Sequence, residues 1–446
     1  MTAHDLAYFR VPAVAAVFSA RALVQRALDV EAALARAEAA AGVIAPSAAD
    51  AIAARCRVEF FDVPALVEEA AAAGTLVVPL VRALTGLVDP PARQAVHWGA
   101  TSQDVLDTAM VLQVREGLAL LERDLRAVGE ACLRLAQDHR RTVMAGRTLL
   151  QHAVPITFGL KAARWLALVT RLVQRMREVA PRVLVVQLGG AAGTLAALGP
   201  AGPRVVELVA RELGLGVPDL PWHAERDRMG EIAALLGLTA GGMAKIAGDL
   251  ALLGQTEVGE VSTAAQAGAG RSSAMPHKRN PADAALALAS ARLAVGAACT
   301  LLAAWPVQEH ERAAGGWQAE WAALPELFER TAAAVTWVRR ALEGVAVDAA
   351  RMRANLAAGG GQVMAEALAV ALAATLGREG AYRAVQRVCD AAARAGLSLE
   401  QAAAADAEIR AALPAEALAR ALEVERYLGS ADLFIDRAVE GFRELG

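Results

Sequence analysis

Three short polar segments carry residue types suited to acid–base chemistry on an anion. The first, residues 97–104, reads His-Trp-Gly-Ala-Thr-Ser-Gln-Asp, and the second, residues 146–152, reads Gly-Arg-Thr-Leu-Leu-Gln-His. The third, residues 268–281, reads Gly-Ala-Gly-Arg-Ser-Ser-Ala-Met-Pro-His-Lys-Arg-Asn-Pro. Each segment precedes a helical pattern, and helix N-termini with hydroxyls and bases nearby bind carboxylates or phosphates. The three segments therefore predict a site for an anionic substrate.

Each segment also has a purely structural explanation. Thr101 or Ser102 could simply cap the helix that follows. A single histidine at a helix start, such as His152, is more often structural than catalytic. The loop 268–281 is harder to explain in this way, because its entry is glycine-rich and the residues from Ser272 to Asn280 include two hydroxyls, three bases and an amide, which make a poor structural element. Such a loop is typical of an anion clamp.

Other familiar chemistries lack their signatures. The sequence has no Walker loop, no GxSxG nucleophile elbow, no HExxH zinc motif and no SxxK motif. Gly268-Ala269-Gly270 lacks the third glycine of a dinucleotide fingerprint, and the pair Glu309-His310 is a weak metal signal. These chemistries can therefore be set aside.

Long helical patterns lie between and after the three segments. Apolar residues recur at helical spacing over 102–139, 155–179, 224–261, 281–305 and 325–342, and shorter helices fill the last hundred or so residues. Ser19 is a plausible N-cap for a helix that runs to Gly42. No stretch alternates as a strand does. The fold is therefore predicted to be all-α.

Composition limits the class of protein. The 446 residues are 56% hydrophobic and 21% charged, a composition that excludes a disordered chain. The net charge is −3, so the protein has no overall positive charge that would attract nucleic acid. The stretch 284–307 has Arg292 as its only charge, and we interpret it as a helix buried on all sides rather than a membrane span. Such a helix predicts an oligomer. Four scattered cysteines fit reduced thiols in a cytoplasmic protein.

The loop from Ser272 to Pro281 resembles the SSxMPxKxNP signature of the fumarase/aspartase superfamily, which includes the adenylosuccinate and argininosuccinate lyases. The other two segments, and their order, match the remaining active-site regions of that superfamily. The resemblance implies a three-domain helical fold with a long central bundle, divided at 1–106, 107–347 and 348–446. It also implies a homotetramer with a twenty-helix core and active sites shared between subunits.

Within the superfamily, the chain is most similar to the bacterial 3-carboxy-cis,cis-muconate cycloisomerases, through the tracts 222–228, 255–260 and 317–321. Phe61 stands where adenylosuccinate lyases usually have histidine, and Ala285 stands where fumarases and adenylosuccinate lyases have the glutamate that partners the second-segment histidine. A carboxylate leaving group, with a conjugate-acid pKa of about 4, needs little acid assistance. Ala285 therefore favours lactone chemistry. Arg271 replaces a usual glycine, and it could stiffen the loop or bind another carboxylate.

The resemblance implies that 3-carboxy-cis,cis-muconate, an intermediate of aromatic degradation, is closed to 4-carboxymuconolactone through an enediolate, without a cofactor or metal. Ser272 and His152 are the predicted catalytic residues, with Ser272 as the proton donor to carbon and His152 assisting. The predicted substrate-binding residues are His97, Thr101, Ser102, Thr148, Gln151, Ser273, Lys278 and Asn280. Two alternatives stay open: a C–N or C–O lyase resembling adenylosuccinate lyase, and a catalytically silent homologue. Neither a nucleic acid nor a membrane is an expected partner.

Overall fold

The computed structural model describes residues 7–263 and 270–446. This part of the chain forms two compact units. The first unit takes the described residues up to 125, then 172–244 and 286–337, and the second takes 126–171, 245–285 and 338–446. A division into two units does not test the predicted division into three domains, so the boundaries after residues 106 and 347 remain predictions.

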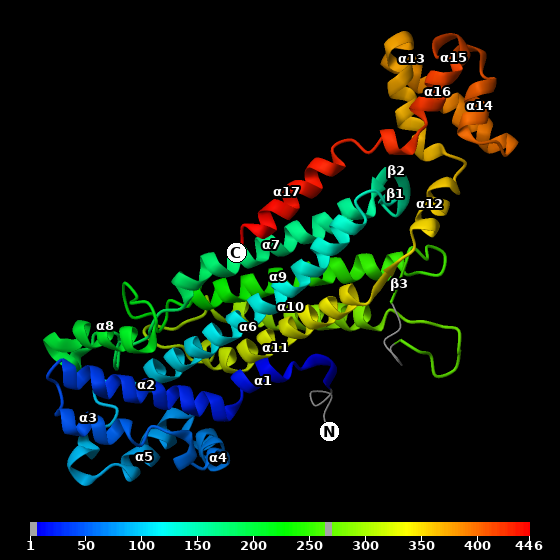
Figure 1. Cartoon of the computed structure of the whole chain (residues 1–446). Coiled ribbons are helices and arrows are strands. Elements are labelled where there is room, and N and C mark those ends of the chain that lie inside the picture. The colour runs from blue at the N-terminus through cyan, green and yellow to red at the C-terminus, as the bar shows by residue number, and fades with distance from the viewer. Residues whose placement is uncertain (1–6, 264–269) are drawn as a thin grey trace. The chain divides into compact units, whose positions relative to one another are not determined.

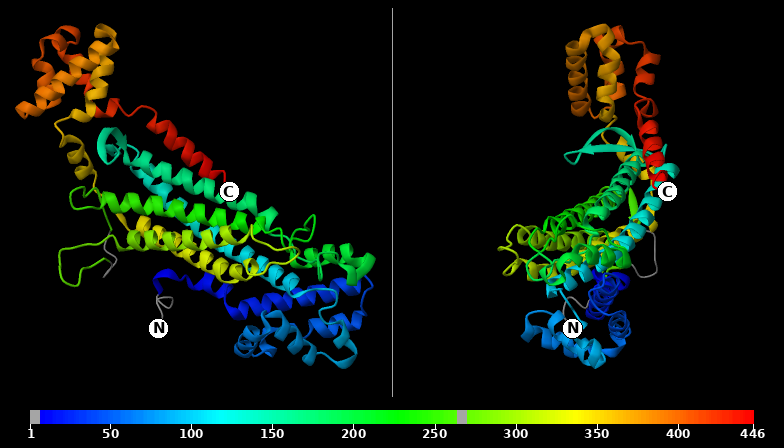
Figure 2. Two further views of the ribbon diagram at one scale, coloured as in Figure 1. Left: turned by 180° about the vertical axis from the view of Figure 1, so that it is seen from behind. Right: turned by 90° about the vertical axis from the view of Figure 1, so that its left-hand side faces the viewer.

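Five long helices connect the two units, since each contributes residues to both. Within each unit their segments run side by side (Figures 1 and 2). They are α6 (Ser102–Asp138), α7 (Phe158–Val183), α9 (Asp227–Leu253), α10 (Ala282–Ala304) and α11 (Gly316–Glu343). The prediction of an all-α fold with long helices is thus confirmed.

Shorter helices complete the first unit. Ser19 caps α2 as predicted, since its side chain accepts the N–H of Ala22 at 3.2 Å. The cluster formed by α2 and α8 buries Leu34, Val186 and Val205. The elements are α1 (Pro12–Val17), α2 (Ala20–Ala40), α3 (Pro46–Ala53), α4 (Val63–Ala73), α5 (Val77–Leu87), α8 (Gly202–Leu213) and the 3-10 turns Ala7–Phe9, Val58–Phe60, Pro90–Ala95 and Ala196–Ala201.

The second unit has its own apolar core, built mainly on α13 and including Leu368, Leu372 and Val388. Its other helices are short, as the sequence predicts, except for α13, which spans 31 residues with a break at Gly377. They are α12 (Ala349–Ala357), α13 (Ala365–Ala395), α14 (Leu399–Ala405), α15 (Ala407–Ala412), α16 (Ala415–Ala421), α17 (Ala431–Arg443) and the 3-10 turns Gln362–Met364 and Val424–Arg426.

The expectation that the chain contains no strands is wrong at two places. Strands β1 (Val143–Thr148) and β2 (Gln151–Thr157) form an antiparallel hairpin, and β3 (Val261–Thr263) pairs with β4 (Val345–Val347). The hairpin turn is Leu149-Leu150, and both residues have positive φ angles, 48° and 64°. Such turns usually carry Asn or Gly. The two leucines therefore do not indicate a turn in the sequence. A bulge between Ala145 and Arg147 also interrupts the alternation of buried and exposed residues by which a strand is recognised.

One helix begins earlier than predicted. Helix α11 starts at Gly316 and contains Pro325, which the sequence suggested as its first residue. A proline lacks a backbone N–H and therefore favours a helix start.

Helices α9 and α10 are long and apolar enough, by length and composition alone, to cross a membrane.

Candidate active site

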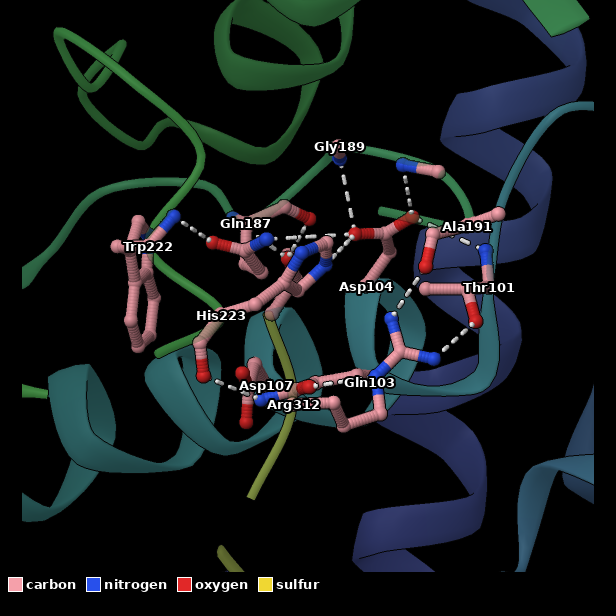
Figure 3. Close-up of polar contacts among 12 residues, drawn as sticks. Thr101, Gln103, Asp104, Asp107, Gln187, Gly189, Ala191, Trp222, His223 and Arg312 are labelled. Atoms are coloured by element: carbon pink, nitrogen blue, oxygen red, sulfur yellow. Dashed lines mark hydrogen bonds and ion pairs between the residues drawn. The ribbon is translucent and has the colours of Figure 1, made fainter. Parts of the chain in front are cut away.

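The N-terminus of α6, in the first unit, is organised around the carboxylate of Asp104 (Figure 3). This buried side chain accepts the backbone N–H groups of Gly189 and Gly190, both at 2.9 Å, and that of Thr101 at 3.0 Å. His223 Nε2 lies 2.7 Å from Asp104 Oδ1. Asp104 therefore connects the start of the helix to the 188–193 turn. Within the described chain, the hydroxyls of Thr101 and Ser102, the expected capping groups, accept no backbone N–H.

Glycines at this point are required by close approach of the backbone. Gly99 and Gly190 both have φ near 70°, a left-handed conformation that favours glycine. A Cβ atom on Gly190 would lie 2.9 Å from the carbonyl oxygen of Gly99. The first polar segment and the 188–193 turn thus hold each other in place beside Thr101 and Ser102.

Arg312 reaches the same helix start from the loop between α10 and α11 (Figure 3). Its guanidinium donates to Thr101 Oγ1 at 3.2 Å, to Gln103 Oε1 at 3.1 Å and to the carbonyl oxygen of Ala191 at 3.1 Å. Sequence reasoning missed this residue. No local motif marks it, and more than 200 positions separate it from Thr101 along the chain.

His97 is held by a buried carboxylate. Its Nδ1 lies 2.6 Å from Oε1 of Glu31, whose side chain is 1% exposed. Burial alone would lower the pKa of His97, but the charge and hydrogen bond of Glu31 outweigh it, and the pKa is raised. His97 also adopts a φ of 58°, in the left-handed region. Glu31 therefore favours an imidazolium beside the predicted anion site.

A second buried carboxyl group, Glu38, lies on the same helix as Glu31. Glu38 is fully buried, and neither of its carboxyl oxygens has a hydrogen-bond partner among the described residues. Burial, followed by the charge of Glu31, raises its pKa to about 8. The folded protein therefore keeps a proton on Glu38 at pH values where the unfolded chain has lost it.

Glu38→Gln is expected to remove a pH-dependent loss of stability. Because the folded state binds the extra proton, wild-type stability should fall as the pH rises from 4.5 towards 8. At about 1.4 kcal/mol per pKa unit, this loss is bounded at about 5 kcal/mol. Urea unfolding should give the variant a larger unfolding free energy than wild type at pH 8.5, and a similar one at pH 4.5. Glu68→Gln, at an exposed position, is the control. Equal pH profiles for wild type and Glu38→Gln would contradict the assignment.

The second polar segment forms the tip of the β1–β2 hairpin, in the second unit. Thr148 pairs with Gln151 and Arg147 pairs with His152 in the ladder, and Thr148, Gln151 and His152 are exposed. The hairpin borders an open hollow of about 690 Å³ that Gln151, His152 and Glu366 help to line. Three of the predicted site residues are thus brought together here and are open to a ligand.

A buried ion pair anchors this hairpin. Arg147 makes a two-pronged contact with Glu260, at 2.9 and 2.6 Å, and Glu260 is 0% exposed. Asn355 Nδ2 donates to Glu260 Oε1 at 2.9 Å and to the Val258 carbonyl at 2.7 Å. A two-pronged guanidinium contact fixes orientation as well as distance. The Arg147 backbone is therefore fixed directly beside Thr148 and opposite His152.

The third polar segment, also in the second unit, is a loop closed at its base. Gly270 accepts the N–H of Asn280 at 2.8 Å, and Arg271 pairs with Arg279 through an isolated backbone bridge. A Cβ atom on Gly270 would lie 2.3 Å from the Asn280 carbonyl oxygen, so this position requires glycine. Residues 268 and 269 of the segment lie outside the described residues. The backbone bridge fits the first expectation for Arg271, a stiffer loop.

Within this loop, Ser272 differs from Ser273. The Ser272 Oγ accepts the backbone N–H of Met275 at 3.0 Å and that of Ala274 at 3.3 Å. Ser272 is half-buried, whereas Ser273 and Lys278 are exposed. Two N–H donors aimed at one oxygen stabilise negative charge on it. Within the described residues, this arrangement distinguishes the Ser272 oxygen from that of Ser273.

Comparison with known proteins gives matches over most or nearly all of the chain. The sequence matches the family described as "Lyase" over residues 8–296 and the family "Adenylosuccinate lyase C-terminus" over residues 361–438. It is 48% identical to 3-carboxy-cis,cis-muconate cycloisomerase of Pseudomonas aeruginosa, over 99% of this chain and 96% of that protein. It is 44% identical to nitrosuccinate lyase of Streptomyces davaonensis, over 93% and 89%. The crystal structure of the 3-carboxy-cis,cis-muconate lactonizing enzyme from Pseudomonas putida matches with a TM-score of 0.91 and 44% identity, over 98% of both chains.

Proposed function

The chain belongs to the fumarase/aspartase superfamily of lyases, and we propose that it works as a 3-carboxy-cis,cis-muconate cycloisomerase in aromatic degradation. The observation that carries this proposal is the similarity, over nearly the whole length, to relatives that bear this name. Ala285 supports it chemically, since a leaving carboxylate does not need the glutamate found at this position in hydration and deamination enzymes.

In the proposed reaction, one carboxylate oxygen of the substrate attacks the alkene and forms the lactone C–O bond. The electron pair of the alkene moves onto the neighbouring carbon and is delocalised into an adjacent carboxylate as an enediolate. Ser272 then gives its proton to that carbon, and the serine oxyanion regains a proton from solvent. The N–H groups of Ala274 and Met275 support this role, because they point at the oxygen that becomes charged.

Fixed donors are needed because the enediolate concentrates negative charge. We assign this work to the predicted substrate-binding residues, at about 3 kcal/mol for a well-placed donor. In the first unit they are His97, Thr101 and Ser102. In the second they are Thr148, Gln151, Ser273, Lys278 and Asn280.

His152→Gln is expected to slow turnover by about tenfold to a hundredfold, near the low end of general acid–base contributions. The reason is that the leaving group of the reverse reaction is a carboxylate, so His152 orients the substrate and adds electrostatic stabilisation. Steady-state turnover numbers provide the measurement. A loss of about ten-thousandfold, at the upper end of such contributions, would instead assign His152 an essential proton transfer and favour the lyase alternative.

We also propose that the protein is a cytoplasmic homotetramer whose sites are shared between subunits, and that it acts on a small polycarboxylate without a nucleic acid or membrane partner. Apolar side chains on α9 and α10 support assembly, since Leu238 is 56% and Leu293 43% exposed in the single chain. Large apolar side chains that stay exposed on long helices favour such an interface, because extended exposed apolar surface marks contacts between proteins.

Light scattering should give the mass of a tetramer. Leu293→Glu, on the exposed face of α10, is expected to shift the protein towards smaller species and to lower activity with it, because a carboxylate would be buried at the interface. A stable monomer with full activity would contradict the assembly.

A lyase acting on a succinyl-type substrate is the second candidate, favoured by the similarity to a relative named nitrosuccinate lyase. An ultraviolet assay separates the two. Loss of the conjugated-diene absorbance of 3-carboxymuconate is expected with the purified protein. Formation of fumarate from adenylosuccinate or argininosuccinate, with no loss of the diene, would support the lyase and contradict the cycloisomerase.

A further inference from the structure

Arg312 and Arg226 both contact the N-terminal part of α6, but they differ in the partners of their guanidinium groups. Arg226 is fully buried and paired with two carboxylates, those of Asp107 and Glu320. Arg312 is half-buried, and in the described part of the chain its guanidinium contacts only neutral acceptors: a hydroxyl, an amide oxygen and a backbone carbonyl. A guanidinium keeps its charge at all working pH values. Its positive charge therefore remains available to an anion beside Thr101.

The contact with Thr101 has a directional consequence. A hydroxyl has one proton to donate and lone pairs that accept. Because Arg312 Nη1 donates to Thr101 Oγ1, it occupies an acceptor position of that oxygen and leaves the hydroxyl proton free to point elsewhere. A hydroxyl fixed in this way is a donor, and a carboxylate accepts only. Arg312 thus orients Thr101 for a carboxylate ligand.

The remaining contacts make the guanidinium rigid. Gln103, which is 0% exposed, accepts from Arg312 Nε and donates through Nε2 to the His223 carbonyl at 2.9 Å. Ala191 belongs to the turn that Asp104 holds through Gly189 and Gly190. Every partner of Arg312 is thus fixed by the network around Asp104, so its charge and its hydrogen bond to Thr101 have a set geometry.

We propose that Arg312 is a positioning residue of the active site, which orients the Thr101 hydroxyl as a donor and places a fixed positive charge beside one carboxylate of the substrate. The inference rests on the proposed function, because the anion concerned is a carboxylate of the polycarboxylate substrate. It adds to that function a residue that no sequence motif marks, and it specifies which atom of Thr101 faces the ligand.

Arg312→Met should raise KM for 3-carboxymuconate by about tenfold to a hundredfold, the size expected for losing a hydrogen bond to a charged group. Turnover at saturation should change by less. Thr101→Val should raise KM similarly, and the double variant should be little worse than either single variant, because both remove one shared interaction. Arg312→Lys should recover only part of the affinity, since a lysine cannot maintain the three-way contact.

Arg115→Met is the matched control. Arg115 also donates to neutral acceptors, the carbonyls of Leu213 and Gly214, but it does not contact the predicted site residues. The KM of Arg115→Met should match that of wild type. Thermal unfolding of each variant checks that it is folded, so that a change in KM is not caused by misfolding. An unchanged KM in Arg312→Met, or effects of Arg312→Met and Thr101→Val that multiply in the double variant, would overturn the proposal. Absence of turnover in the wild type would instead contradict the proposed function itself.

Discussion

Ser272→Ala is expected to abolish lactone formation, with turnover reduced by about a thousandfold or more, within the range of general acid–base contributions combined with oxyanion stabilisation. The physical reason is that Ser272 supplies the proton to carbon, and its oxygen is the one that the N–H groups of Ala274 and Met275 face. Alanine has no proton to give. Substrate affinity should change little, because binding rests on Thr101, Thr148 and the other assigned donors.

Ser273→Ala is the matched control, one residue along the same loop. Within the described residues, the Ser273 hydroxyl has no backbone N–H aimed at it, and the side chain is exposed. Its turnover should fall by no more than about a hundredfold, the effect of losing one donor to the enediolate, and so stay well above that of Ser272→Ala. Turnover and substrate affinity should be measured for both variants. Near-normal turnover in Ser272→Ala with an inactive Ser273→Ala would move the role by one residue, and near-normal turnover in both would end the serine mechanism.

The largest expected effect on stability is at Arg226. Its guanidinium contacts Asp107 at 2.5 and 3.1 Å and Glu320 at 3.1 Å, and all three side chains are 0% exposed. Trp317 Nε1 adds a hydrogen bond to Asp107 at 2.8 Å. Arg226→Met would leave two carboxylates buried without their cation. A loss of about 3–5 kcal/mol in the unfolding free energy is expected.

Urea unfolding, followed by circular dichroism, measures this loss. Arg182→Met is the control, since Arg182 pairs with Glu231 at the surface, where an ion pair contributes little to stability. If Arg226→Met is too unstable to purify, Glu320→Gln provides a milder test, because it keeps the shape and removes one charge. A change below about 1 kcal/mol in Arg226→Met, no larger than for a surface pair, would contradict a stabilising role for the cluster.

The elements that could be predicted from sequence are those with a strong local signal. Helix α6 begins at Ser102 and α10 at Ala282, within a residue or so of the expected positions, because apolar periodicity and polar segments mark both starts. The hairpin β1–β2 was not predicted. Its turn uses Leu149 and Leu150 at positive φ, a conformation that leucine rarely adopts, and the ion pair of Arg147 with Glu260 holds the strands from a distant part of the chain.

For the site, the three polar segments could be found from sequence, but their supporting residues could not. Glu31 holds His97 from 66 residues away, and Arg312 reaches Thr101 across 211 positions. Such contacts depend on tertiary packing and leave no spacing pattern. The sequence alone gives no physical reason to prefer Ser272 over Ser273, because the two are adjacent residues of the same type. The backbone N–H groups of the loop, which donate to Ser272, supply that reason.

The most direct test of the central claim is to run the reaction in D2O and identify the product by NMR. The Ser272 hydroxyl exchanges with solvent, so a cycloisomerase that protonates carbon should convert 3-carboxy-cis,cis-muconate to 4-carboxymuconolactone with one deuterium bonded to carbon, next to a carboxylate. Unchanged 3-carboxymuconate after prolonged incubation, with fumarate released from a succinyl substrate under the same conditions, would contradict the account.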